Sequence, residues 1–98
     1  MEPRRHKKAT INDQPYDTAE AMILAYYKYS VFDDEGISFL MRTPDGRFFV
    51  FDQNAYAPKL DRLEALSRVE AESRFNNYIR LVTKKEAFTI ARKKERRL

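Results

Sequence analysis

The 98-residue chain contains no cysteine and no tryptophan, and it has a single histidine and only two glycines. Without cysteine there is no disulfide framework, no thiolate metal site and no cysteine nucleophile. The lone histidine, His6, lies in a basic segment, so a zinc site built on histidines is excluded. Absence of cysteine is also typical of proteins made for a reducing compartment. We therefore expect no metal and no cofactor.

Long apolar runs are missing as well. No stretch approaches the roughly 20 apolar residues that a membrane-spanning helix needs. The basic start of the chain is not followed by the apolar region of a signal peptide. We therefore expect a soluble, cytoplasmic protein without a membrane partner.

The residues that enzymes use are also scarce. Nucleophilic catalysis needs a serine, threonine or cysteine beside a base, and His6 is the only imidazole in the chain. The one acidic cluster, Asp33-Asp34-Glu35, lacks the spacing of a calcium loop, and we interpret it as a hydrated loop before Gly36. No glycine-rich phosphate loop is present. We expect the protein not to be an enzyme. An enzyme of an unrecognised type, based on lysine or carboxylate groups, is the alternative ranked below the two binding functions given at the end of this section.

Charge is distributed unevenly along the chain, whose net charge is +4. Residues 1–8 carry +3 and residues 84–98 carry +5, whereas residues 9–83 carry −4. We therefore predict a basic N-terminal tail over residues 1–8, a single domain over residues 9–91 and a basic C-terminal tail over residues 92–98. Basic ends favour nucleic acid or acidic protein surfaces, although short charged tails also simply aid solubility.

The strongest local pattern is a β-hairpin. The apolar runs 37–42 and 47–52 flank Thr43-Pro44-Asp45-Gly46, in which proline suits the second turn position and glycine supplies a positive φ. Both faces of the two strands carry apolar side chains, so we expect the hairpin to be central, with cover on one side and partial cover on the other.

Helical periodicity and capping boxes predict about three helices around this hairpin. The first, over about 18–28, rests on an apolar stripe that includes Met22 and Ile23, although residues 26–32 also suit a strand. The second, over 68–80, follows a capping box at Ser67, and the third, over 84–95, follows one at Thr83. Residues 7–11 can form a short strand, and residues 60–66 a strand or a turn. The predicted fold class is α+β.

Aromatic and basic residues suggest two kinds of surface. Phe48, Phe49 and Phe51 near basic residues resemble a base-stacking platform, but in a small protein such rings are more often core, and we favour core. The basic residues are the candidates for binding a partner or nucleic acid by phosphate contacts. They are Arg42, Arg47, Lys84, Lys85, Arg92, Lys93, Lys94, Arg96 and Arg97.

Four segments together resemble a known group of proteins. They are residues 16–21 (YDTAEA), 40–49 (LMRTPDGRFF), 66–71 (LSRVEA) and 86–88 (EAF). In this order they are similar to small proteins of bacterial phages, plasmids and other mobile elements. That group shares a YDT helix start, an LYRT-x-x-G-x-F-F hairpin and an LS-x-EEA helix start. The chain departs from the group over residues 52–60, where the group is often rich in glycine, and in its basic end.

The resemblance implies an α+β fold and a phage or mobile-element accessory protein. Proteins of this kind often inhibit host defences or regulate by binding, but the group supplies no site residues. We therefore expect a non-enzymatic protein that binds a macromolecular partner, such as a host defence complex in an anti-CRISPR-like manner. The alternative is a nucleic-acid-binding accessory or regulatory protein that uses its basic ends. The sequence does not predict an oligomeric state.

Overall fold

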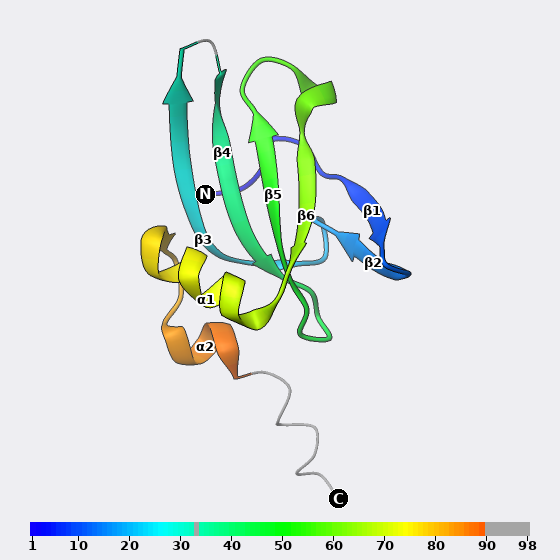
Figure 1. Cartoon of the computed structure of the whole chain (residues 1–98), viewed down its shortest axis with the longest axis vertical. Coiled ribbons are helices and arrows are strands. Elements are labelled where there is room, and N and C mark those ends of the chain that lie inside the picture. The colour runs from blue at the N-terminus through cyan, green and yellow to red at the C-terminus, as the bar shows by residue number, and fades with distance from the viewer. Residues whose placement is uncertain (33, 90–98) are drawn as a thin grey trace, which may run out of the picture.

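The computed structural model describes residues 1–32 and 34–89, and these residues form a mostly β structure (Figure 1). Its elements, in chain order, are β1 (Lys8–Ile11), β2 (Gln14–Asp17), β3 (Met22–Val31), β4 (Asp34–Arg42), β5 (Phe48–Asn54), η1 (Pro58–Leu60), β6 (Arg62–Leu66), α1 (Arg68–Asn77), β7 (Ile79–Arg80) and α2 (Lys84–Phe88). No helix in these residues is long and apolar enough to cross a bilayer.

Five of the strands form one antiparallel sheet in the order β6-β5-β4-β3-β7. The predicted hairpin is its centre: β4 pairs with β5 from Gly36↔Asn54 to Arg42↔Phe48. Gly46 closes the bend with a φ of 94°, as the Pro-Asp-Gly pattern predicted. The hairpin prediction is therefore confirmed, with strands longer than expected.

Apolar side chains on alternate residues of the sheet form two separate cores. On one face, Leu40, Phe48 and Val50 pack under α1 and α2, where they contact Phe75 and Phe88. On the other face, Phe39, Met41, Phe49 and Phe51 pack with Tyr16 of the separate β1-β2 hairpin. The rings of Phe39, Phe49 and Phe51 are fully buried, so the interpretation of these rings as core is confirmed.

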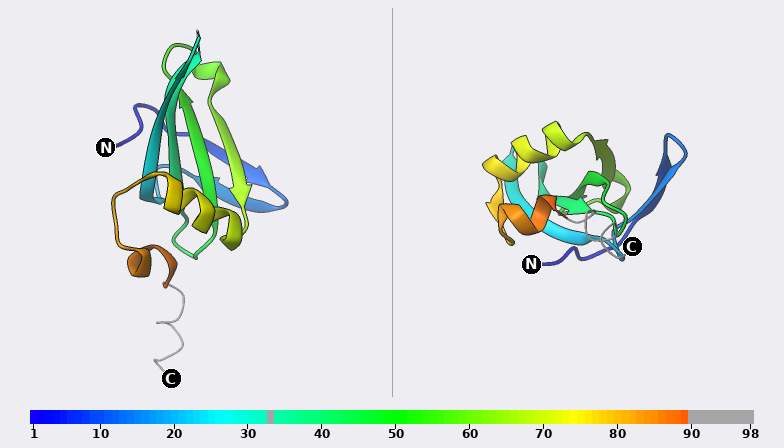
Figure 2. Two further views of the ribbon diagram at one scale, coloured as in Figure 1. Left: turned by 60° about the vertical axis from the view of Figure 1, so that its left-hand side comes forward. Right: turned by 90° about the horizontal axis from the view of Figure 1, so that it is seen from below.

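The helices lie at one end of the sheet. Because α1 follows β6 and precedes β7, it crosses the sheet from one edge strand to the other. Figure 2 shows the sheet curling around this helix, with α2 beside it and the β1-β2 hairpin standing apart. The opposite end, which carries the β3-β4 turn and the β5-β6 connection, is called the distal end below.

The first predicted helix, over about 18–28, is wrong, since residues 22–31 form β3. Tyr26, Tyr27, Tyr29 and Val31 favour strand, and β3 pairs with β4 along its length. A bulge between Ile23 and Ala25 shifts the register of the strand. The helix-like spacing at Met22 and Ile23 therefore reflects a strand whose two faces are both partly buried.

The other two predicted helices are shorter than expected. Helix α1 begins after the predicted cap Ser67 but ends at Asn77, because residues 79 and 80 pair with β3 as β7. Helix α2 begins after the predicted cap Thr83 and ends at Phe88, and the rest of the predicted helix over 84–95 lies mainly outside the described residues. The predicted α+β class with three helices is thus replaced by a mostly β fold.

Candidate functional site

The structure describes two residues of the acidic cluster, Asp34 and Glu35. Asp34 and Glu35 belong to strand β4 instead of a hydrated loop. Asp34 accepts a hydrogen bond from Asn54 Nδ2 at 3.1 Å, and Glu35 accepts one from the Tyr56 hydroxyl at 3.0 Å. Within residues 1–32 and 34–89 no group of acidic or histidine side chains is arranged to hold a metal. Both carboxylates therefore position the neighbouring connection.

A surface hollow of about 730 Å³ lies at the distal end. Its apolar members come from β3, from the β3-β4 turn and from the β5-β6 connection. We call four of them the distal rim: Val31, Phe32, Tyr56 and Leu60. They are 57%, 98%, 70% and 55% exposed. Asp34 and Arg62 add one charge of each sign to the lining.

Phe32 is the most exposed member of the distal rim. It stands at the tip between β3 and β4 and adopts a φ of 53°, in the left-handed region. Glycine, asparagine and aspartate tolerate this region, whereas for a bulky side chain it is unfavourable by about 1–2 kcal/mol. Exposure of the ring to water is also unfavourable. The isolated protein thus gains nothing from an aromatic side chain at this position.

The opposite part of the distal rim is held by hydrogen bonds from one buried residue. Asn54 Oδ1 accepts hydrogen bonds from the backbone N–H groups of Tyr56 and Ala57, both at 2.9 Å. The Asn54 N–H donates to Asp61 Oδ1 at 2.8 Å. Since both ends of the connection are fixed to Asn54, Tyr56 and Leu60 are presented on a preorganised segment.

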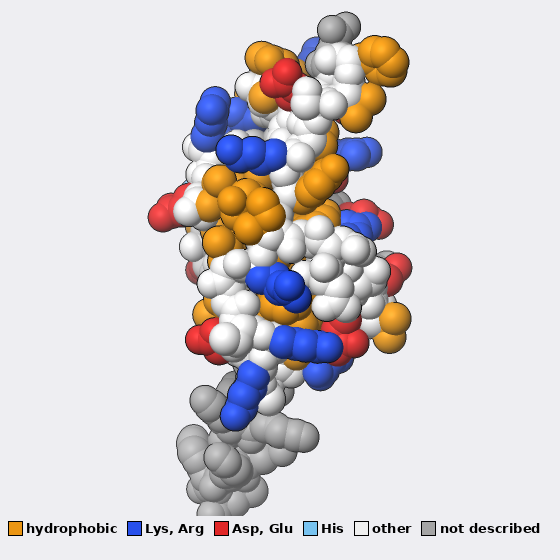
Figure 3. All heavy atoms as spheres, turned by 90° about the vertical axis from the view of Figure 1, so that its left-hand side faces the viewer, with side chains coloured by type: hydrophobic (Ala, Val, Ile, Leu, Met, Phe, Trp, Pro, Cys, Tyr) orange, Lys and Arg blue, Asp and Glu red, His pale blue; other side chains and the backbone are white. Residues whose placement is uncertain are grey.

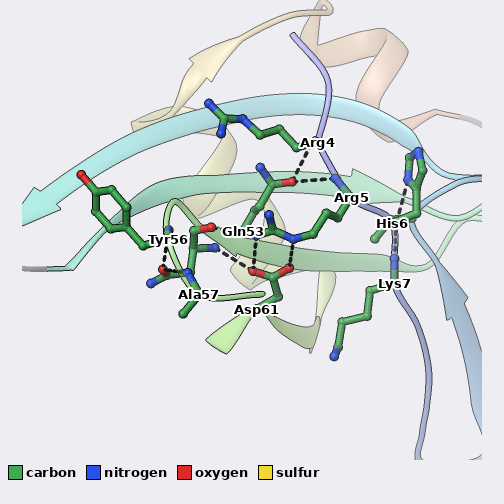
Figure 4. Close-up of polar contacts among 10 residues, drawn as sticks. Arg4, Arg5, His6, Lys7, Gln53, Tyr56, Ala57 and Asp61 are labelled. Carbon is green, nitrogen blue, oxygen red and sulfur yellow. Dashed lines mark hydrogen bonds and ion pairs between the residues drawn. The ribbon is translucent and has the colours of Figure 1, made fainter. Parts of the chain in front are cut away.

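The connection is also fixed by the N-terminal segment Arg4–Lys7, which we call the strap (Figure 4). Arg5 makes a two-pronged ion pair with Asp61, with both nitrogen–oxygen distances at 3.0 Å. Gln53 Oε1 accepts hydrogen bonds from the backbone N–H groups of Arg4 and Arg5, at 2.7 and 3.2 Å. The Lys7 N–H donates to Thr18 Oγ1 at 2.9 Å. Residues 4–7 thus lie along the body of the protein.

The electrostatics of the strap favour the ionised form of Asp61. Burial of the Asp61 carboxyl opposes its ionisation, but hydrogen bonds from Arg5 and from the Asn54 N–H outweigh this and lower its pKa. Only 6% of its side chain is exposed. The carboxylate therefore remains charged and bound to Arg5 at neutral pH.

The two tyrosines of the distal hollow keep neutral phenols. Burial, and then the charges of Asp34 and Asp52, raise the pKa of Tyr29 above its usual value. The hydrogen bond to Glu35 raises the pKa of Tyr56. Neither hydroxyl is poised to lose a proton near neutral pH, so these two phenols offer aromatic surface and hydrogen-bond donors to the hollow.

Two of the basic residues predicted as a site, Arg42 and Arg47, make contacts within the fold. Arg42 donates from Nη1 to the carbonyl oxygens of Glu86 and Ala87, at 2.6 and 2.7 Å, and so holds α2. Arg47 pairs with Asp45 at 3.2 Å, donates to the Pro15 carbonyl and lies over the Tyr16 ring. The two guanidinium groups are thus engaged by different parts of the fold.

Lys84 and Lys85 are exposed in the first turn of α2, near the end of the sheet that carries Arg42. The remaining predicted site residues lie outside the described part of the chain: Arg92, Lys93, Lys94, Arg96 and Arg97.

The sequence did not predict the distal rim. In the sequence, Val31 and Phe32 lie only at the end of a segment that suits a strand. A usable signal was present, since a phenylalanine directly precedes two aspartates, a residue type that favours turns. Tyr56 and Leu60 carry no such signal, because their exposure depends on how the β5-β6 connection folds.

Comparisons with protein-family models, curated proteins and solved structures find no match to this chain.

Proposed function

We propose that this protein acts without catalysis, by binding a protein partner through the distal rim. The observation that carries the proposal is Phe32, an aromatic side chain 98% exposed on a backbone conformation unfavourable to it. Strained residues tend to occur where a function requires them. A partner that buries the ring supplies the compensating free energy.

The surroundings of Phe32 support a protein as the partner. Aromatic anchors at the centre of an interface, surrounded by polar groups, provide most of the binding energy in many protein complexes. Here Phe32 and Tyr56 are the anchors, and Asp34 and Arg62 line the same hollow. The hydrogen bonds of Asn54 and the strap fix one side of the rim, which lowers the entropy lost on binding.

The resemblance to phage and mobile-element proteins suggests where to look for the partner. Under that resemblance the partner is a component of a bacterial host, and a defence complex is the first candidate. The nucleic-acid alternative rests on Lys84, Lys85 and the basic residues beyond Thr89, because Arg42 and Arg47 are already engaged within the fold.

The test uses Phe32→Asn beside a matched control. Asparagine accepts the left-handed conformation, so we expect this variant to unfold at a higher temperature than the wild type. The control is Val69→Asn, which replaces another exposed apolar side chain, 75% exposed on α1 and away from the rim. Each protein is used as bait in bacterial lysates, and retained proteins are identified by mass spectrometry and then purified for titration.

We expect one partner retained by the wild type and by Val69→Asn, with at least tenfold weaker binding to Phe32→Asn. A hot-spot aromatic commonly contributes 2 kcal/mol or more, about a thirtyfold change in affinity. A partner bound equally by all three proteins, or no partner from several hosts, contradicts the proposal. A salt-sensitive complex with DNA or RNA would support the alternative instead.

A further inference from the structure

One edge of the five-stranded sheet is open along half of a strand. Strand β3 pairs with β4 over its whole length, from Met22 to Val31. On its other side β7 pairs only with Ala25 and Tyr26. Within the described residues no strand covers residues 27–31, which we call the free edge. Figure 3 shows this side of the molecule, where orange side chains gather beside several blue ones.

The backbone direction along the free edge follows from its neighbour. The Leu81 N–H donates to the Leu24 carbonyl at 2.9 Å, so the polar groups of Leu24 point away from β4. Polar groups alternate in direction along a strand, which places those of Tyr26 toward β7 and those of Lys28 and Ser30 outward. Both residues are exposed. The free edge thus offers two N–H groups and two carbonyls to another strand.

We propose that the free edge binds a second copy of this chain, so that two sheets join into one across a two-fold axis at Tyr29. The two β3 strands run antiparallel, with Lys28 of each copy opposite Ser30 of the other. This pairing forms four backbone hydrogen bonds, because both residues point their polar groups at the partner strand. A two-fold contact of this kind is self-complementary and closes after two copies.

The neighbouring registers are disfavoured by the same geometry. If Lys28 paired with Lys28 of the other copy, the two ammonium groups would face each other. Ser30 would then lie opposite Tyr26, which already pairs with β7. If Ser30 paired with Ser30 of the other copy, Lys28 would lie opposite Phe32, where the strand has already ended and φ is left-handed. The register centred on Tyr29 lies between these two barriers.

Side chains on both faces match in this register. On the helix-covered face, Tyr27 lies opposite Val31 of the other copy, so two side chains that are 49% and 57% exposed cover each other. On the other face, Lys28 lies opposite Ser30 of the other copy. Ser30 neighbours Glu35 across β3 and β4, so each ammonium is directed toward a carboxylate of the other copy.

The free edge also lacks most of the features that keep edges from pairing. Residues 27–31 contain no proline, and the bulge of β3 lies earlier, between Ile23 and Ala25. One charged side chain, Lys28, is present, and the favoured register directs it toward a carboxylate of the other copy. An open, regular strand with apolar neighbours is the kind of edge that another strand extends.

The test uses the purified protein alone, so its outcome is separate from that of the partner proposal. Sedimentation velocity over a concentration series should show a monomer converting to a dimer and no larger species. Ser30→Pro removes an outward N–H and the exposed Ser30 hydroxyl, which donates to Glu35 at 3.5 Å, but it removes no backbone hydrogen bond to β4, because the N–H of Ser30 is not directed at that strand. We expect this variant to keep the wild-type circular dichroism spectrum and to remain monomeric at concentrations at least tenfold higher.

A single introduced cysteine tests the register, because the chain has no cysteine of its own. Under mild oxidation Tyr29→Cys should form a disulfide-linked dimer, since residue 29 lies opposite its own copy. Lys28→Cys and Ser30→Cys should form little disulfide-linked dimer. In this register residue 28 lies opposite residue 30 of the other copy, so neither introduced cysteine faces its own equivalent. A wild type that is monomeric throughout, or equal cross-linking at all three positions, would overturn the proposal.

Discussion

Asp61 is the residue on which the distal end depends most directly, because one carboxylate fixes both the strap and the β5-β6 connection. Burial opposes ionisation of this carboxyl, but the Arg5 guanidinium and the Asn54 N–H both donate to it and lower its pKa below the usual 3.8. Since the folded-state pKa is lowered, this stabilisation is present above pH 3.8 and is lost as the pH falls through the folded-state value.

Asp61→Asn should therefore destabilise the protein at neutral pH by about 1–3 kcal/mol, because it removes the charge that pairs with Arg5. The free energies of unfolding of wild type and variant should converge as the pH is lowered below 3.8. Urea denaturation at a series of pH values measures both. A difference that is constant with pH would show that the charge of Asp61 is not the cause.

At Gly36, close contact with neighbouring atoms leaves no room for a larger residue. A Cβ at this position would overlap the Gln53 carbonyl oxygen on one side and the Tyr29 ring on the other. Gly36→Ala should therefore cost about 1–3 kcal/mol through overpacking. The comparison is Gly46→Ala, where no atom lies within 4 Å of the added Cβ but φ is 94°, so about 1 kcal/mol of backbone strain is expected. Thermal denaturation ranks the two variants, and a milder effect at Gly36 would contradict the steric account.

At the scale of elements, α2 is held to the sheet by Arg42 and Phe88. The Arg42 guanidinium donates to two carbonyls near the C-terminus of this short helix, where a positive charge is favourable. The Phe88 ring lies 5.1 Å from that of Phe48 and 5.4 Å from that of Phe75. A helix of this length is unstable alone, so these contacts decide whether it forms.

Arg42→Leu should accordingly increase amide hydrogen exchange in α2, at Ala87 and Phe88, and destabilise the protein by about 1–3 kcal/mol. Lys84→Gln is the control, because Lys84 is exposed on the same helix and its loss should change stability by less than about 0.5 kcal/mol. If Arg42→Leu leaves exchange in α2 unchanged, the guanidinium is available for a partner, as the sequence predicted.

The elements also show where sequence patterns were sufficient. The capping boxes at Ser67 and Thr83 and the Pro-Asp-Gly bend each fixed a boundary, because their hydrogen bonds are local. The stretch 18–28 was misassigned because its residues suit both a helix and a strand. Only pairing with the distant β4 decided between them.

At the scale of the whole molecule, the two cores share the same strands. Strand β5 directs Phe48 and Val50 into one core and Phe49 and Phe51 into the other. Neither face can lose its packing without exposing strands that support the other face. The described residues should therefore unfold as one cooperative unit.

Phe75→Leu in one core and Phe51→Leu in the other test this coupling. Each replaces a fully buried ring and should lower stability by about 1–3 kcal/mol. In both variants far-ultraviolet circular dichroism and tyrosine fluorescence should report a single coincident transition. Two separated transitions in either variant would mean that the cores fold independently.

The sequence by itself determined the features that depend on neighbouring residues. These are the central hairpin and its two apolar faces, the starts of α1 and α2, and the absence of thiol chemistry. Local hydrogen bonds, turn geometry and alternation of side chains act over a few residues, so a pattern is enough to predict them.

Only the tertiary structure decided the strand at residues 22–31, the roles of Arg42 and Arg47, and the surfaces left exposed. The distal rim joins residues 31 and 32 with residues 56 and 60, and the free edge exists because β7 covers only two residues of β3. Such features depend on contacts between segments far apart in the chain. Residue type alone does not specify which side chains those contacts bury and which they leave in water.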